Sequence, residues 1–395
     1  MSLTNGVTRS PKALIAKLHQ ISSRLDEDDD DARNECLQLS QALTIEMESP
    51  ENRAIDLAFW PMISSSARIA IELNLFEYIV QHGPVAAKTL SALSGGEELL
   101  IVRILRLLSP GHFVEETAPK TWKAAPVTEA LASKEIAAGH RTISHTVTPA
   151  MTNAHAFFRS QGHLSSVTDP TNGLIQFALG TELSCFEYMA TQPTLLKDFN
   201  LYMGNGLGSR KSWLDWFPVQ ERILDGVEAP VVVDVGGGKG HDLVAFSQRF
   251  PSIGTLVLED LSPVIEGLEF NGIDKVAYDF FTEQPVTGAR VYIYHHILHD
   301  WSDEHCLEIL NRVVSAMTPG YSKLLILDMI LPDQGASLFH AQMDIAMMAF
   351  NGGMERTKEQ WQVLLERAGL CITEIWDAVD EGGDGIIEAV RCCSV

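Results

Sequence analysis

Basic residues are scarce in this chain. It contains 29 Lys and Arg against 52 Asp and Glu among 395 residues, a formal net charge of −23. An acidic surface repels the phosphates of nucleic acids and the head groups of anionic lipids, so neither a nucleic acid nor a membrane is expected as a partner. A small molecule is the better expectation.

Long hydrophobic runs and patterned cysteines are also missing. No apolar stretch reaches the roughly 18 to 20 residues that cross a bilayer, and no apolar leader stands near the start. The cysteines are scattered, without the spacing of metal ligands. They are Cys36, Cys185, Cys306, Cys371, Cys392 and Cys393. We therefore expect free thiols, no bound metal and a cytoplasmic location.

The length and composition are those of a globular protein with several domains. Hydrophobic residues make up 46% and charged residues 21% of the chain. At roughly 150 residues per domain, it has room for two or three. We predict an acidic tail and docking helix over residues 1–50, a helical domain over 51–134, a helical linker over 135–228 and an α/β domain over 229–395.

The first segment contains an acidic run at residues 26–31. Such a run suits a partner-binding tail or the solvated flank of a helix, and we favour the flank. A loose tail is expected first, and then an amphipathic docking helix over residues 36–47.

The second segment has helical periodicity. One helix is predicted where apolar residues recur at steps of three and four until Gly83-Pro84. Its apolar positions are Ile69, Leu73, Phe76 and Val80. Short helices over 85–93 and 99–108 and a hairpin of 113–115 with 121–123 follow, an order typical of a winged helix. Because the second short helix has only two arginines, we predict dimerisation or packing and not DNA recognition.

The linker segment is rich in aromatic and methionine side chains. They are Phe157, Phe158, Phe177, Phe186, Tyr188, Met189, Met203, Trp213, Trp216 and Phe217. Most are expected in the core. Pockets for small molecules concentrate between domains, so some of these side chains, with Phe186 and Met203 as candidates, are predicted to line a substrate cavity.

Strands and helices alternate after residue 230, which predicts a mostly parallel, doubly wound sheet with helices on both faces. The predicted strands cover residues 231–233, 255–258, 276–278, 291–294 and 324–327, with a closing pair near 371–375 and 385–390. A helix over 242–250 follows the first strand. The fold class is therefore α/β, of the Rossmann-like kind.

A glycine loop joins the first of these strands to its helix. Glycine lets backbone N–H groups approach a ligand closely, which by itself indicates a nucleotide-like ligand. The spacing of Gly236, Gly238 and Gly240 departs from the dinucleotide fingerprint, because His241 stands where the third glycine is due. The motif of a Walker phosphate loop is absent as well, since no Ser or Thr follows Lys239.

Carboxylates follow the strands around this loop. Asp234 ends the first strand, Asp260 stands at the end of the next, about 20 residues after the glycines, and Asp279 with Phe280 ends the third. A site with three acids and no clustered bases suits an adenosine ligand that carries positive charge. S-adenosylmethionine, with its sulfonium and ammonium groups, fits better than NAD.

Four segments resemble the plant and fungal small-molecule O-methyltransferases of the caffeic acid type. They are residues 231–240, 258–261, 278–281 and, most specifically, the run 297–304 that contains His299-Asp300-Trp301. The resemblance covers roughly residues 55–392. It implies a class I methyltransferase fold, a homodimer formed through the winged-helix segment, and S-adenosylmethionine as cofactor.

The resemblance also implies residue roles around the cofactor. Gly236 and Gly238 would approach the methionine part, Asp260 would hold the ribose, and Asp279 with Phe280 would hold the adenine. His295 stands where plant members often have Lys, and we interpret it as a cofactor-side or packing residue.

Catalytic roles follow from the same resemblance. His299 matches the catalytic base and Glu355 a carboxylate that orients it, while Asp328 replaces a Glu of the plant members and is one methylene shorter. The helix before Glu355 matches a substrate-lining helix, and its candidates are Met343, Met347 and Asn351.

The chemistry of methyl transfer to oxygen is compatible with these residues. The hydroxyl proton must leave as the bond forms, and a neutral imidazole oriented by a carboxylate can take it. A zinc site at His295, His296 and His299 is disfavoured, because no His-Glu-x-x-His spacing is present. A cyclase that catalyses a pericyclic reaction on the same fold is the alternative, with His140, His145 and His155 as hydrogen-bond donors.

Overall fold

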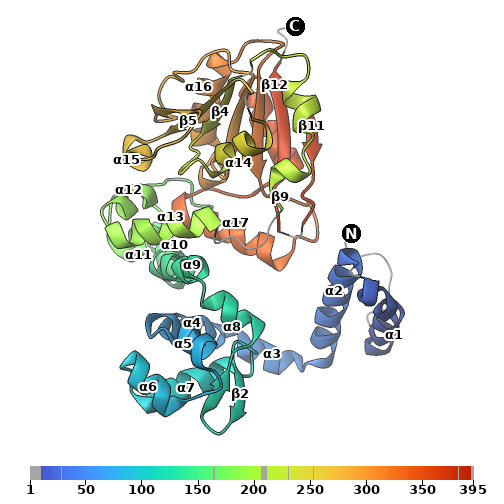
Figure 1. Ribbon diagram of the computed structural model, residues 1–395, viewed down its shortest axis with the longest axis vertical. Helices are drawn as coiled ribbons and strands as arrows, with labels where there is room; N and C mark the ends of the chain where they lie inside the picture. The colour runs from blue at the N-terminus through green and yellow to red at the C-terminus, as the bar shows by residue number, and fades with distance from the viewer. Residues whose placement is uncertain are drawn as a thin grey trace. The chain divides into compact units, whose positions relative to one another are not determined.

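A computed structural model describes residues 10–27, 29–162, 165–205, 211–229, 231–251, 253–380 and 382–392. The chain forms two compact units, residues 1–132 and 133–395 (Figure 1). Among the described residues, no helix combines the length and the apolar character that crossing a membrane requires.

The first unit begins with a pair of packed helices. Helix α1 (Pro11–Ile21) and helix α2 (Asp30–Met47) bury Leu14, Ile21 and Leu39 between them. Asp29 caps α2 by accepting the Ala32 N–H at 2.9 Å, so part of the acidic run serves as a helix cap. The expected loose tail is wrong for residues 11–21, because Ser10 and Pro11 start a helix there with its own apolar contacts.

The rest of the first unit combines helices with a small sheet. The helices are α3 (Pro50–Leu57), α4 (Trp60–Glu72), α5 (Leu75–His82), α6 (Ala87–Ser94), α7 (Glu98–Leu108) and α8 (Pro126–Leu131). The strands β1 (Val85–Ala86), β2 (Glu115–Ala118) and β3 (Thr121–Lys123) pair in the order β1-β3-β2. One continuous helix through Ile69 and Val80 is wrong, because Asn74 adopts φ 53° and separates α4 from α5. Ile69 and Val80, two of the predicted apolar positions, are exposed.

Helices also open the second unit. They are α9 (Lys134–His145), α10 (Val147–Gln161), α11 (Leu174–Leu179), α12 (Cys185–Ala190) and α13 (Pro193–Asn205), followed by the short turns η2 (Trp213–Asp215) and η3 (Gln220–Leu224). Arg141 of α9 and Asp198 of α13 form two hydrogen bonds, at 2.7 and 2.6 Å. Phe157 and Met189 from this group share an apolar cluster with Phe350 of helix α17 (Leu338–Asn351), so α17 belongs to the same helical layer (Figure 1).

A sheet of seven strands in the order β11-β12-β8-β7-β4-β5-β6 forms the rest of this unit. The strands are β4 (Val231–Val235), β5 (Thr255–Asp260), β6 (Ile273–Ala277), β7 (Val291–His295), β8 (Lys323–Asp328), β11 (Leu370–Trp376) and β12 (Gly385–Arg391). The first five of these strands are parallel to one another, whereas β12 pairs antiparallel with both β8 and β11. The predicted Rossmann-like sheet is thereby confirmed, with boundaries that shift by one to three residues.

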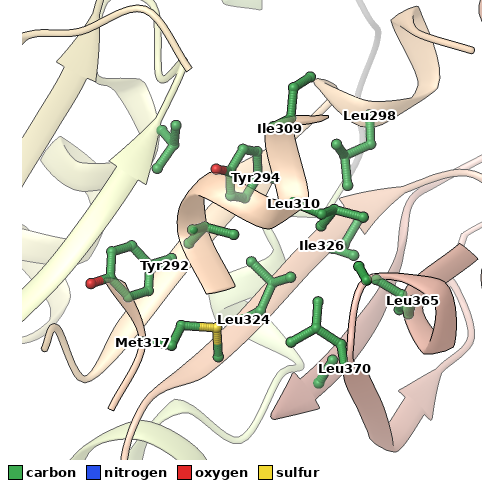
Figure 2. Packing of buried hydrophobic residues seen from close by; sticks show 14 of the residues in the cluster. Tyr292, Tyr294, Leu298, Ile309, Leu310, Met317, Leu324, Ile326, Leu365 and Leu370 are labelled. Atoms are coloured by element: carbon green, nitrogen blue, oxygen red, sulfur yellow. The ribbon is translucent and has the colours of Figure 1, made fainter. Parts of the chain in front are cut away.

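Helices cover both faces of this sheet. They are α14 (His241–Arg249), α15 (Ser262–Ile265), α16 (Asp303–Ala316) and α18 (Lys358–Arg367), and the short strands β9 (Ile330–Leu331) and β10 (Arg356–Thr357) pair beside them. Along β8, Leu324 and Ile326 pack on one face with α16 and α18 (Figure 2), and Leu325 packs on the other face with α14. This alternation is that of a strand buried on both sides.

The cysteines differ from expectation at one place. Cys371 of β11 and Cys392, just after β12, form a disulfide, because the antiparallel pairing places their Cα atoms 5.1 Å apart. The prediction of free thiols is therefore wrong for these two residues. Cys36, Cys185 and Cys306 are free, and Cys393 lies outside the described residues. The cytoplasmic location stays a prediction.

The double-sided burial of β8 gives a test of stability. We expect Ile326→Ala to lower the free energy of unfolding by about 2 to 4 kcal/mol, because it leaves a cavity at a fully buried position. Val363→Ala on the exposed side of α18 is the control, with a change within about 0.5 kcal/mol. Urea unfolding followed by circular dichroism measures both. Equal losses in the two variants would contradict the packing described.

Candidate functional site

The glycine loop lies at the carboxyl edge of the sheet, between β4 and α14. Strand β4 pairs with β7 on one side and with β5 on the other, so the loop occupies the point where the order of the strands reverses. Open α/β sheets bind their ligands at such points. Gly236, Gly238 and Gly240 have φ values of 72°, 58° and 74°, which side chains rarely tolerate.

The loop packs tightly against the protein at Gly236 and Gly237 and is open at Gly238. A Cβ atom on Gly237 would lie 2.3 Å from Asp234 Oδ2, and one on Gly236 would lie 2.6 Å from Ile297 Cδ1. A Cβ on Gly238 would meet no atom within 4 Å. The peptide at Gly238 therefore borders open space, where a ligand can approach the backbone.

Asp260 ties this loop to the end of β5. The N–H groups of Gly238 and Leu261 donate to its two oxygens, at 2.8 and 2.7 Å. Each carboxylate oxygen keeps a lone pair for a ligand hydroxyl. The position is compatible with the ribose contact that was predicted for Asp260.

Asp234 is buried beneath the loop, and within the described part of the chain only the charge of His295 acts to lower its pKa. Neither of its oxygens has a hydrogen-bond partner among the described residues. Burial, and next the nearby charge of Asp242, raise the pKa of Asp234 well above its usual range. A buried carboxyl group without a hydrogen-bond partner at this place fits a cationic ligand, which would favour its ionised form, and disfavours a phosphate.

Asp279 and Phe280 follow β6. Asp279 is exposed, and its Oδ1 accepts the N–H of Phe281 at 3.0 Å, which closes a tight turn. The half-buried ring of Phe280 lies beside Gly236 and packs edge-on against Trp301, with ring centroids 6.0 Å apart. Phe280 therefore borders the glycine loop, as an adenine contact requires.

His295 and His296 both face Asp384, although adjacent residues of a strand normally point to opposite sides. The cause is the backbone of His296, which has φ 54°. His296 Nε2 lies 2.7 Å from Asp384 Oδ1, and His295 Nε2 lies 3.4 Å from Asp384 Oδ2. His295 Nδ1 is 2.6 Å from Asp242 Oδ2.

These contacts set the charge of the pair. Burial alone lowers the pKa of His295, but Asp242 and Asp384 outweigh it and raise that pKa well above its usual range. The potential ligand atoms of His295, His296 and Asp384 lie within 4.8 Å of one another. Hydrogen bonds already join them, and the expected absence of a metal stays a prediction. Neither Asp242 nor Asp384 was expected at the site. Asp242 could have been found from the sequence, because it is an acidic residue in the first turn of α14, directly after the glycine loop.

His299 lies in the short turn η4 (Leu298–Asp300), a few residues after β7. Its Nδ1 lies 2.9 Å from Glu355 Oε1 and 3.8 Å from Asp328 Oδ1. Its Nε2 is 3.8 Å from Asp300 Oδ1 and has no hydrogen-bond partner among the described residues. Glu355 thus orients the ring directly, whereas Asp328 interacts with it only through charge.

The turn before Glu355 fits closely against the backbone of η4. Met354 N–H donates to the carbonyl of His299 at 2.9 Å, and a Cβ on Gly353 would lie 2.0 Å from that oxygen. The buried guanidinium of Arg356 donates to the carbonyls of Leu298 and Trp301, at 2.9 and 2.8 Å. Arg356 therefore positions the turn that carries His299. This role was not expected from the sequence, although Arg356 directly follows Glu355.

The carboxylates around His299 determine its protonation. Burial alone lowers the pKa of His299, but Glu355, Asp328 and Asp300 together raise it to about 10. Burial raises the pKa of Asp328 to about 8 and that of Asp300 to about 6. In this arrangement the imidazole carries a proton at neutral pH.

Aromatic rings gather next to this turn. Phe186 packs against Phe350 with centroids 5.3 Å apart and stacks on Trp301 at 6.4 Å. Asn351 is buried, and its amide donates to the carbonyl of Asp300 at 3.2 Å. The structure thus brings Phe186 and Asn351 to the turn that carries His299.

The three methionine candidates are less enclosed. Met343 and Met347 are half-buried on α17, and Met203 is exposed on α13. His145 and His155 are exposed as well, which weakens their proposed role as donors in a pocket.

Comparison with known proteins agrees with this site. The O-methyltransferase domain family matches residues 166–371, just over half of the chain. O-methyltransferase penC of Penicillium thymicola is 57% identical over 387 residues, covering 96% of this chain and 97% of the relative. The chain therefore belongs to the O-methyltransferases of fungal secondary metabolism, which use S-adenosylmethionine.

Solved structures show the same fold. OxaC in complex with SAH and oxaline superposes with a TM-score of 0.86 at 25% identity and covers 97% of this chain and 99% of OxaC. A pericyclic reaction enzyme superposes with a TM-score of 0.85 at 27% identity and covers 97% of this chain and all of that protein, 100%. The chain is thus a class I methyltransferase with a helical N-terminal region.

The packing beneath the glycine loop leads to a prediction. We expect Gly237→Ala to abolish detectable S-adenosylmethionine binding and to lower the melting temperature, because its Cβ collides with the Asp234 carboxylate. Gly272→Ala is the control, since its φ of 79° makes the change mildly strained but open space surrounds the new Cβ. Thermal shift with and without the cofactor measures both effects. If S-adenosylmethionine raised the melting temperature of Gly237→Ala as much as that of the wild-type protein, the loop geometry would be contradicted.

Proposed function

We propose that this enzyme methylates a hydroxyl group of a small aromatic or polyketide-like metabolite, with His299 as the general base. The observation that carries the proposal is the buried 2.9 Å contact between His299 Nδ1 and Glu355 Oε1. It holds the ring by one nitrogen and leaves Nε2 without a partner among the described residues, which suits an acceptor hydroxyl.

The cofactor supplies a methyl group on a sulfonium, and the protein residues bind, orient and deprotonate. Gly236, Gly238 and Asp260 would hold the methionine and ribose parts, and Asp279 with Phe280 the adenine. Asp234 and His295 complete this proposed set. The pKa of Asp234 is raised in the free protein, and its carboxyl would become the anion beneath the methionine part once the cation has bound. The acceptor hydroxyl must lie about 3 to 3.5 Å from the methyl carbon and within hydrogen-bond reach of His299.

The chemical class of the acceptor is inferred from the aromatic side chains near the turn that carries His299. Phe186 stacks on Trp301, which lies two residues after His299, and aromatic rings at this place suit a planar aromatic acceptor, which gains from stacking and from loss of water. We propose that Phe186 and Asn351 contact the acceptor or the turn that holds it, and that Met343, Met347 and Met203 contribute apolar contact.

A pericyclic reaction is the second candidate, supported by the fold shared with a pericyclic reaction enzyme. Such a reaction needs no base beside a methyl group. The pairing of the His299 imidazole with the buried Glu355 carboxylate would then have no purpose, so we favour methyl transfer.

Loss of the imidazole tests the first candidate. We expect His299→Ala to lower the rate of label transfer from methyl-labelled S-adenosylmethionine to a panel of phenols by roughly 10²- to 10⁴-fold, the usual worth of a general base. His82→Gln is the matched control and should keep the full rate, since His82 is exposed at the end of α5 and has no role in either candidate function. Product that forms without label, and equally in both variants, would favour the pericyclic reaction.

We also propose that the first unit is a winged-helix module that forms a homodimer. Apolar side chains on α3 and α4 and between them stand 49% to 59% exposed. They are Ile55, Leu57, Phe59, Trp60 and Met62. An apolar patch of this kind is typical of a protein interface, and a second copy of this chain is its proposed occupant.

A charge in this patch should prevent dimerisation. We expect the wild-type protein to show twice the chain mass in light scattering and Trp60→Glu to show the mass of a single chain. Leu338→Glu, at an exposed position on α17, is the control and should keep the dimer. A monomeric wild-type protein would contradict the proposed interface.

A further inference from the structure

Negative charge exceeds positive charge around His299. Glu355, Asp328 and Asp300 lie 2.9, 3.8 and 3.8 Å from its ring nitrogens. Both oxygens of Asp328 and Oε2 of Glu355 are buried without a hydrogen-bond partner among the described residues. Buried carboxylates that lack partners require a nearby cation or a proton.

The other charged neighbours do not supply that cation. His296 stacks on His299 with ring centroids 5.1 Å apart, and it faces Asp384. His295 is shared between Asp384 and Asp242. Arg356 directs its donors to two carbonyls and Asp303. The carboxylates of the cluster are thus left to His299, which is positive only when it is protonated, or to protons of their own, since burial raises the pKa of Asp328 to about 8.

We propose that His299 carries a proton in the free enzyme and that binding of the cationic methyl donor expels this proton, which leaves a neutral base next to the acceptor. The inference rests on the proposed function of His299. It gives the carboxylates a role beyond orientation, because they keep the base inactive until the donor has bound.

The size of the effect follows from the geometry of the reaction. Base, acceptor oxygen and methyl carbon must be in contact, so the sulfonium lies within roughly 7 Å of the imidazole. At that distance and an effective dielectric constant of about 20, a positive charge lowers the pKa of an imidazole by ~2 units. The pKa of His299, about 10 in the free protein, would fall toward the working range of the enzyme.

The proton balance of the reaction is consistent with this cycle. The acceptor oxygen forms a bond to the methyl carbon, the carbon–sulfur bond breaks with its electron pair on sulfur, and the hydroxyl proton moves to His299 Nε2. The product thioether is neutral, so the imidazolium is again stable beside the carboxylates. The proton that each turnover generates would then leave when the next donor binds.

Calorimetry with three ligands tests the proposal. S-adenosylmethionine and sinefungin carry a positive charge near the reacting centre, and S-adenosylhomocysteine has a neutral sulfur there. At pH 8.5, in buffers of different ionisation enthalpy, we expect both cationic ligands to release about 0.5 to 1 proton more than S-adenosylhomocysteine. Between pH 8 and the free pKa, their affinity should rise by up to tenfold per pH unit. Equal proton counts for all three ligands would overturn the proposal.

Nuclear magnetic resonance locates the proton. With labelled histidine, the signal of His299 is identified by its absence in His299→Gln. We expect an imidazolium in the free enzyme and with S-adenosylhomocysteine at pH 8.5, and a shift toward neutral imidazole with sinefungin. A neutral ring in the free enzyme, or an unchanged imidazolium with sinefungin, would overturn the proposal.

The label-transfer assay keeps the two hypotheses apart. Transfer that depends on His299 together with equal proton counts would refute the proton release alone. A charge-dependent proton release without label transfer to any hydroxyl would refute the proposed methylation and leave the coupling between donor and histidine intact.

Discussion

The site depends on the buried hydrogen bond between His299 Nδ1 and Glu355 Oε1. It joins the turn after β7 to the turn after α17, two segments that are far apart in the sequence. By occupying Nδ1, the carboxylate selects the orientation of the ring and leaves Nε2 for the acceptor. The same bond imposes a cost, since a carboxylate without full solvation raises the proton affinity of its neighbours.

The surrounding structure meets that cost in two ways. Arg356 donates to the carbonyls of Leu298 and Trp301, and Gly353 lets the chain pack closely on the backbone of His299. The imidazole ring therefore has little freedom to turn away from Glu355. The excess of negative charge would be neutralised by a bound cation. Asp234 beneath the glycine loop and Asp328 beside His299 both lack hydrogen-bond partners among the described residues. An acid-rich site of this kind explains why a strongly acidic protein binds a positively charged cofactor.

Much of this was predictable from local sequence. The strands of the sheet were identified because apolar runs bounded by glycine and acidic residues repeat along the chain. His299, Glu355 and Asp328 were identified through motifs that keep their spacing, and Asp260 through its distance from the glycines. In each case the signal lies within a short segment, where the period or the motif is complete.

Only the tertiary structure decided the features that join distant segments. Asp384 meets His295 and His296 because β12 lies beside β8 and the backbone of His296 turns its side chain, and Cys371 meets Cys392 because β11 and β12 are antiparallel. The sequence by itself determined the fold class and the cofactor, and it singled out the histidine that we propose as the base. Which carboxylates surround that base, and therefore which charge it carries, was decided by packing, because Coulomb energy depends on distances in space and not along the chain.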